Sequence, residues 1–99
     1  MIEATLDAAT EFSAPIFVPR GRQLAISLIG STWTGTIQIQ RLVKAEGDSS
    51  YPAHDDTAWG VVSSHTDDVQ EQVATGDGCW YRAYCSARAA GSMAVRLHI

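Results

Sequence analysis

Two short histidine–aspartate groups are the residues of this sequence best suited to bind a metal. The first is HDD at residues 54–56, and the second is HTDD at residues 65–68. Imidazole and carboxylate ligands together suit transition metals. Neither group has the ligand spacing of an HExxH motif or of an EF-hand loop, and Asp-rich stretches beside a strand are also typical of solvated turns. We therefore expect no metal site and no cofactor.

Nucleophilic and acid–base chemistry have no recognisable motif in this chain. The serines lie outside any GxSxG pattern, and Cys79 and Cys85 lie in a strand-like run typical of small buried thiols. A glycosidase-type carboxylate pair stays open as an alternative, because eleven acidic residues always offer some pair. We expect a protein that is not an enzyme and has no catalytic residues.

The aromatic residues could form a platform on which sugars stack. Trp33 and Trp59 lie in strands with apolar neighbours, where core packing is the more common role of an aromatic ring. Trp80 shares its strand face with Arg82 and Tyr84 and is the best candidate for an exposed aromatic. A carbohydrate-binding module therefore remains an alternative function.

Composition narrows the range of partners. Charged residues make up only 18% of the 99 residues, below the usual proportion of about a quarter, as expected if part of the surface meets other subunits. The net charge is −4, and the arginines form no basic stripe of the kind nucleic-acid binders show. No run approaches the roughly eighteen apolar residues of a membrane span, and the acidic N-terminus lacks the basic region of a secretory signal. We expect no direct contact with nucleic acid or membrane.

The strongest element is a strand at residues 31–43, STWTGTIQIQRLV. Trp33, Ile37 and Ile39 fall on one parity and polar residues on the other, which predicts one buried and one wet face. Gly35 lies on the apolar parity, where it leaves room for the indole or marks a bulge.

Shorter alternations predict further strands, and the turn residues between them predict how the strands connect. Gly30 and Ser31 should turn the chain tightly into the strand at 31–43 and form a hairpin, and a second turn is expected at 89–92. Pro15 and Pro19 should confine their segment to a sheet edge. The expected shorter strands span residues 2–6, 12–18, 23–29, 58–64, 69–73, 79–87 and 92–99.

This spacing of strands favours an all-β fold, an antiparallel β-sandwich of seven to eight strands in which barrel-like closure is possible. We expect a single β domain over residues 1–99, with 1–22 as an N-terminal arm and edge strand. A six-stranded barrel with a loose N-terminal arm is the alternative architecture. The residues expected to be buried between the sheets are Leu28, Trp33, Ile37, Ile39, Tyr81, Ala83, Val95 and Leu97.

The two cysteines are too far apart to form a disulfide with each other. Six residues of continuous strand separate Cys79 from Cys85 by about 20 Å, whereas a disulfide needs Cα atoms within about 7 Å. We expect two free thiols, compatible with folding in a reducing compartment.

Three segments follow one another in the order LAISLIGSTWTGTIQIQR (24–41), TAWGVV (57–62), and WYRAYCS (80–86) leading into SMAVRLHI (92–99). Their order and patterns resemble small β-sandwich virion proteins of tailed bacteriophages. In that family a strand with the pattern W-x-G-T-hydrophobic-x-hydrophobic-x-R precedes a Trp strand, a Tyr-Arg strand, and a Gly-Ser turn into a final V-R-L strand. The resemblance covers residues 24–99. The matching residues are Trp33, Gly35, Thr36, Ile37, Ile39, Arg41, Trp59, Tyr81, Arg82, Gly91, Ser92, Val95, Arg96 and Leu97. The polar loop at 44–57 is longer than the compact turn of the family.

The resemblance implies a structural protein of the virion, made in the bacterial host cytoplasm. A capsid decoration or cement protein is expected, which binds the major capsid protein or other virion subunits and self-associates on the lattice; a neck or tail component is the alternative. The contacts are expected on the proline-bearing edge at 13–19, on the loop at 44–57 and on an exposed aromatic. The expected partner-binding residues are Ile16, Phe17, Tyr51, His54 and Trp80.

Overall fold

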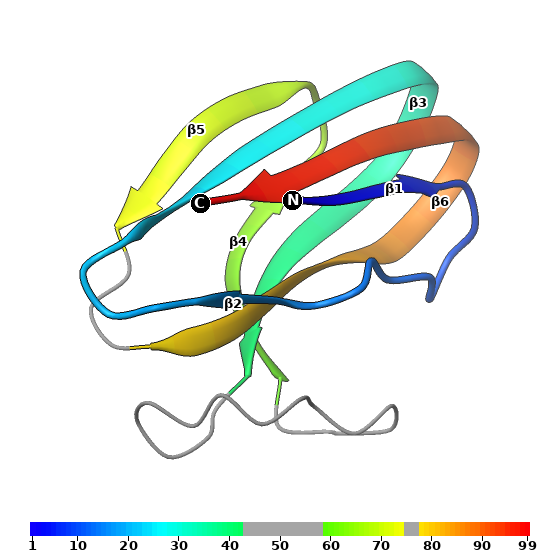
Figure 1. Cartoon of the computed structure of the whole chain (residues 1–99). Coiled ribbons are helices and arrows are strands. Elements are labelled where there is room, and N and C mark those ends of the chain that lie inside the picture. Colours follow the sequence, from blue (N-terminus) through cyan, green and yellow to red (C-terminus); the bar gives the residue numbers. More distant parts are fainter. Residues whose placement is uncertain (43–58, 75–77) are drawn as a thin grey trace.

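The computed structural model describes residues 1–42, 59–74 and 78–99, and these ranges contain antiparallel strands and no helix (Figure 1). The part of the chain that is described therefore holds no helix that could cross a membrane. The six strands are β1 (Ile2–Leu6), β2 (Ile16–Val18), β3 (Gln23–Leu42), β4 (Trp59–His65), β5 (Val69–Ala74) and β6 (Cys79–His98).

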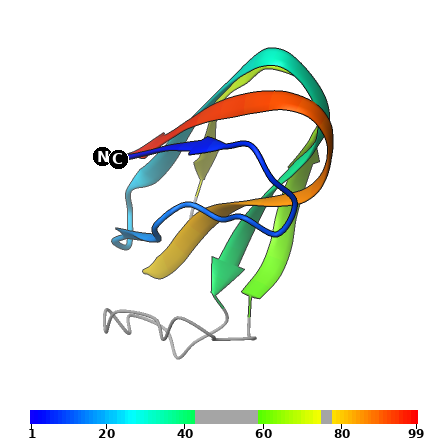
Figure 2. The same cartoon turned by 90° about the vertical axis from the view of Figure 1, so that its right-hand side faces the viewer.

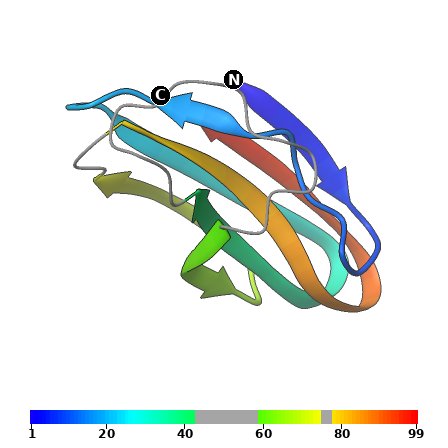
Figure 3. The same cartoon turned by 90° about the horizontal axis from the view of Figure 1, so that it is seen from below.

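Two strands of 20 residues, β3 and β6, pair with each other along most of their length and organise the sheet. Figure 2 shows them curving over together, so that the two halves of the sheet face each other. We call the half made of β1, residues 92–98 of β6, residues 23–31 of β3 and β5 the β1–β5 layer. The half made of β2, residues 79–90 of β6, residues 34–42 of β3 and β4 is the β2–β4 layer (Figure 3).

The predicted hairpin at Gly30 and Ser31 is wrong. Both residues lie inside β3, and the two halves of this strand pair with β6 instead of with each other. The turn expected at 89–92 likewise lies inside β6. The residues that the structure describes therefore form six strands where seven to eight were predicted, and their sheet is open at the edges, not closed into a barrel.

Bulges and glycines explain why these segments bend without reversing. The β3–β6 register shifts between Ser31 and Gly35 and again after Thr36, and such bulges bend a strand while its pairing continues. Gly91 has φ +76°, a conformation that side chains disfavour. At Gly35 an added Cβ would lie 2.7 Å from Cζ2 of Trp33 and would meet the backbone of β6. This glycine thus does both things expected of it, because it makes room for the indole and lies at a bulge.

The core lies between the two layers and follows the predicted parity. Trp33 is the exception among the expected core residues, because it is half-buried at the bend and packs against the rim of the cluster. The cysteines are both free, as predicted, with Cys85 buried and Cys79 half-buried. The buried cluster comprises Leu6, Val18, Leu24, Ile26, Leu28, Ile37, Ile39, Tyr81, Ala83, Cys85, Met93, Val95 and Leu97.

The N-terminal segment is paired to β6 in both layers. β1 pairs from Ile2 opposite Leu97 to Leu6 opposite Met93, as the expected strand at 2–6 requires. The strand expected at 12–18 is shorter and covers only 16–18. Before it, the Ser13 N–H donates to Ala83 O at 2.9 Å, and the Ser13 hydroxyl accepts from Ala83 N–H at 3.0 Å. The side chain of Ser13 thus takes the place of a backbone acceptor just before Pro15.

Candidate partner-binding surface

The outer face of the β2–β4 layer gathers aromatic rings around one arginine. Cζ of Arg82 lies 4.5 Å from the ring centroid of Phe12, 4.3 Å from that of Trp59 and 5.7 Å from that of Tyr84. We call these four residues the Arg82 cluster. Phe12 comes from the segment before β2, where it forms an isolated bridge with Tyr84, and Trp59 comes from β4.

Sheet register explains why the guanidinium is held in place. Arg82 lies directly opposite Gln40, and its Nε–H donates to Gln40 Oε1 at 2.8 Å. The Gln40 amide in turn donates to Gln38 Oε1 at 3.2 Å. A cation over an aromatic ring contributes about 0.5–2 kcal/mol, more where water is excluded, and Arg82 is half-buried. The cluster therefore binds three separate segments of the chain to one side chain.

A separate pair of aromatic rings lies on the same layer, where β2 pairs with β6. The rings of Phe17 and Trp80 meet edge to face, with centroids 5.5 Å apart. Trp80 is only 9% exposed, so the expectation that it is an exposed aromatic is wrong. Its cover comes in part from β2, since Phe17 lies opposite Trp80 in the register.

The predicted partner-binding residues are brought together only in part. Phe17 and Trp80 are in contact, whereas Ile16 is half-buried and packs against the core cluster. Tyr51 and His54 lie outside the described residues. The sequence-based predictions did not include Phe12 in this surface, and they assigned Trp59 to the core. The parity shared by Trp80, Arg82 and Tyr84 was the one indication of this surface.

The second histidine–aspartate group takes part in local structure at the turn between β4 and β5. His65 Nε2 lies 2.9 Å from Ser63 Oγ and 3.5 Å from Glu71 Oε1. Asp68 Oδ1 accepts from Gly30 N–H at 2.8 Å and so supports the bend of β3. Within the described ranges no group of three or more His, Cys, Asp or Glu could hold a metal ion. The first group, at 54–56, lies outside them.

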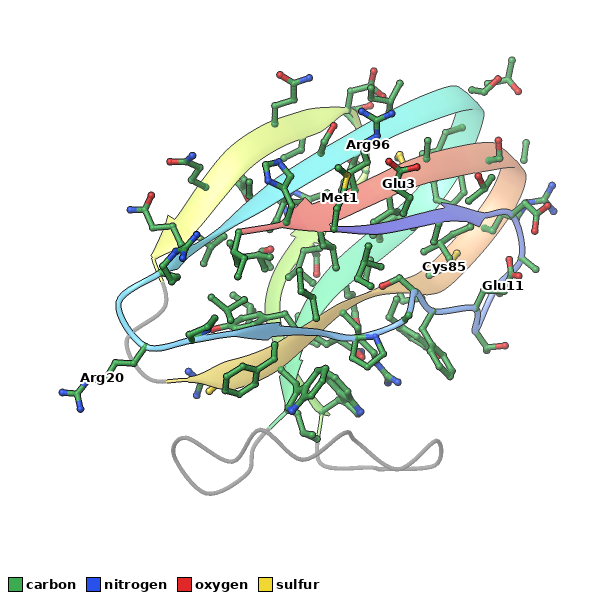
Figure 4. All side chains as sticks on the ribbon, viewed as in Figure 1. Met1, Glu3, Glu11, Arg20, Cys85 and Arg96 are labelled. Atoms are coloured by element: carbon green, nitrogen blue, oxygen red, sulfur yellow. The ribbon has the colours of Figure 1, made fainter. Side chains whose placement is uncertain are left out.

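The outer face of the β1–β5 layer is mostly polar. Arg96 and Glu3 form an exposed ion pair with 3.6 Å between Nε and Oε1 (Figure 4). A shallow open groove runs beside Arg96, with Ala25 and Ser27 at its base and Gln70 and Gln72 among the residues that line it. Ile29, 52% exposed as its parity predicts, is the large apolar residue of this face.

The two buried titratable groups of the core are kept protonated. Burial raises the pKa of the Tyr81 hydroxyl, and a negative charge on Cys79 would raise it further, against the lowering effect of Arg41. Burial also raises the pKa of the Cys85 thiol. A thiol needs a lowered pKa and access to solvent to act as a nucleophile, so Cys85 is suited to packing.

Comparisons of the chain with protein-family models, with curated proteins and with solved structures find no match. Functional inference therefore rests on the residues and on the geometry described above. That geometry offers an aromatic face with Arg82 at its centre on one layer and a polar face on the other.

Proposed function

We propose that this chain is a non-enzymatic structural protein of a tailed phage particle, most specifically a capsid decoration protein that binds the capsid lattice. The observation that supports this most is the order of strand pairing. With the halves of β3 and β6 counted separately, the first segment along the chain pairs with the last, the second with the next to last, and so on inward. The chain is then one long antiparallel ribbon wrapped into two layers.

Such a wrapped ribbon has the connectivity of a jelly roll, an eight-stranded double-sheet architecture that recurs in viral capsid and lectin domains. This is our proposal for the finer fold class, and it agrees with the β-sandwich expected from the sequence. Because one fold serves many functions, the resemblance to virion proteins is needed to choose among them. The positions that carry the resemblance have structural roles here: Gly35 and Gly91 at the bend, and Trp59 against Arg82.

The carbohydrate-binding alternative has less support from the geometry. A sugar platform needs aromatic faces that are open to solvent. In the Arg82 cluster the guanidinium already lies over the rings of Phe12 and Trp59, and Trp80 is buried. A protein surface is the partner that this face fits better, since aromatic residues and arginine are enriched in protein interfaces.

We propose that the capsid contact involves the edge at 13–19, with the half-buried ring of Phe17 at its centre and Ile16 and Trp80 supporting it, together with Tyr51 and His54 of the loop at 44–57. The proposed partners are the major capsid protein and neighbouring copies of this chain. The proposed location is the virion. A neck or tail position is the alternative that the experiment below would detect.

Binding of the purified chain to phage particles that lack it tests this function. We expect saturable co-sedimentation with mature capsids, lost or weakened when residues 47–55 are deleted or Phe17 is replaced by alanine. Ile29→Ala, on the outer face of the other layer, is the matched control and should bind normally. Immunogold labelling at the neck or tail would instead support the alternative position of the chain in the particle. Absence of the chain from purified virions would disprove the proposal.

A further inference from the structure

Among the described residues, four strands form the outer edges of the two layers, and three of them contain or adjoin residues that discourage pairing with another chain. Pro15 and Pro19 flank β2, Glu3 lies within β1, and Glu71 lies within β5. Prolines and charged side chains on an edge strand prevent its open backbone groups from pairing with a foreign strand. β4, with the sequence WGVVSSH, contains neither, and His65 is its single titratable residue.

β4 also exposes two adjacent large apolar side chains. Val61 is 56% exposed and Val62 is 43% exposed. Here the register skips Val62, since Ile39 pairs with Ser63 and Gln40 with Val61. Because of this bulge, two successive valines are exposed to solvent on an edge strand that contains no Asp, Glu, Lys or Arg.

We propose that β4 is a self-association edge, at which two copies of this chain pair β4 to β4, antiparallel, about a two-fold axis near Val62. Such a contact is isologous, because each copy presents the same strand to the other. It would extend each β2–β4 layer into one sheet that runs across both copies, and it would cover the two valines of each.

The distribution of charge around β4 favours a second copy in the antiparallel direction. At the His65 end, Asp67, Asp68 and Glu71 make the surroundings acidic. At the opposite end, Arg41 lies across from Gly60 and the guanidinium of Arg82 lies over Trp59. Antiparallel pairing brings Asp67, Asp68 and Glu71 of one copy toward Arg41 and Arg82 of the other, whereas parallel pairing would bring these like charges together. The paired strands themselves contain no Asp, Glu, Lys or Arg.

The mass of the free chain in solution tests this pairing. Sedimentation equilibrium over a range of concentrations should show a dimer that weakens as salt is added, because the charge complementarity is screened. Val62→Lys should raise the dimer dissociation constant about tenfold or more, since it places two like charges near the axis. Ile29→Lys makes the same change at a similarly exposed isoleucine away from β4, and it should leave the dimer intact.

Two further variants keep the test decisive. If Val62→Lys lowers the melting temperature, Ser64→Lys, at another exposed position of β4, replaces it with the same expected result. Val62→Cys should give a disulfide-linked dimer under mild oxidation, whereas Ile29→Cys and the unchanged chain should not. A monomer at every concentration, or a dimer that tolerates lysine at both β4 positions, would overturn the inference. No particle is present in this experiment, so its outcome is independent of the proposed function.

Discussion

The two layers share one core but present very different outer faces. The β2–β4 layer carries the Arg82 cluster, in which rings from three segments surround one half-buried guanidinium. The β1–β5 layer carries mostly polar side chains and an exposed ion pair between Arg96 and Glu3. Both arginines lie on β6, outside the core. From this difference we expect the surroundings of a charge, more than its presence, to decide how much it contributes to stability.

The largest expected effect compares the inside with the outside of a single strand. Ile39→Ala, at a fully buried position of β3, should lower the free energy of unfolding by about 2–5 kcal/mol. Ile29→Ala removes the same atoms from an exposed position of β3 and should change it by less than about 0.5 kcal/mol. Urea denaturation measures both. Equal losses at the two positions would contradict the assignment of inner and outer faces.

The next effect compares the two arginines. Arg82→Ala should cost about 1–3 kcal/mol, because it removes the cation–ring contacts and leaves the nearly buried Gln40 without its donor. Arg82→Lys keeps the charge but not the planar group, so most of this loss should remain. Denaturant melts of the two variants measure the losses. A lysine variant as stable as the parent chain would show that charge alone is enough there.

The core-facing sides of the two layers should contribute differently to the pH dependence of stability in alkaline solution. Tyr81 and Cys85 face the core from the β2–β4 layer, and burial raises both pKa values above 10.0 and 9.0, their ordinary values. The folded state therefore keeps protons that the unfolded state loses, so stability is complete below about pH 9 and falls as pH rises through the folded pKa values.

Melting temperatures between pH 7 and pH 11 measure this loss. Tyr81→Phe and Cys85→Ala should each make the alkaline decline shallower, even if they lower stability at pH 7. A parent chain with no alkaline decline would contradict the burial of these two groups in the native state.

The smallest effect is expected on the polar face. Arg96→Ala should change the free energy of unfolding by less than about 0.5 kcal/mol, because its ion pair with Glu3 is exposed to water. Any loss should vanish at high salt. A salt-resistant loss as large as that of Arg82→Ala, seen in the same denaturant melts, would remove the contrast between the two faces.

Local patterns were enough to predict the inner face of most strands. The alternation around Ile37 and Ile39 is a property of neighbouring residues, and it predicted their burial correctly. The same holds for the run from Leu24 to Leu28. The all-β class and the two unpaired cysteines followed from the same kind of reasoning.

The errors arose where a distant segment decides the outcome. Gly30 and Ser31 suit a reversal as well as a bend, and it is the pairing of β6 through this point that selects the bend. Trp80 has the parity of a surface residue, but β2 lies beside it. Phe12 came from a segment predicted as a strand, and its contact with Arg82 depends on tertiary packing alone. No pattern of neighbours contains that information.

The pairing of β1 with the end of β6 has a mechanical consequence. Ile2 lies opposite Leu97, so both chain ends emerge from the same end of one antiparallel pair (Figure 1). In such a pair the hydrogen bonds run perpendicular to the strands. A force that pulls the two ends apart therefore loads these bonds one after another, starting at Ile2, and peels β1 away at low tension. A force applied between the bend of β6 and the N-terminus would load the β1–β6 ladder in shear, so that its hydrogen bonds would have to break together.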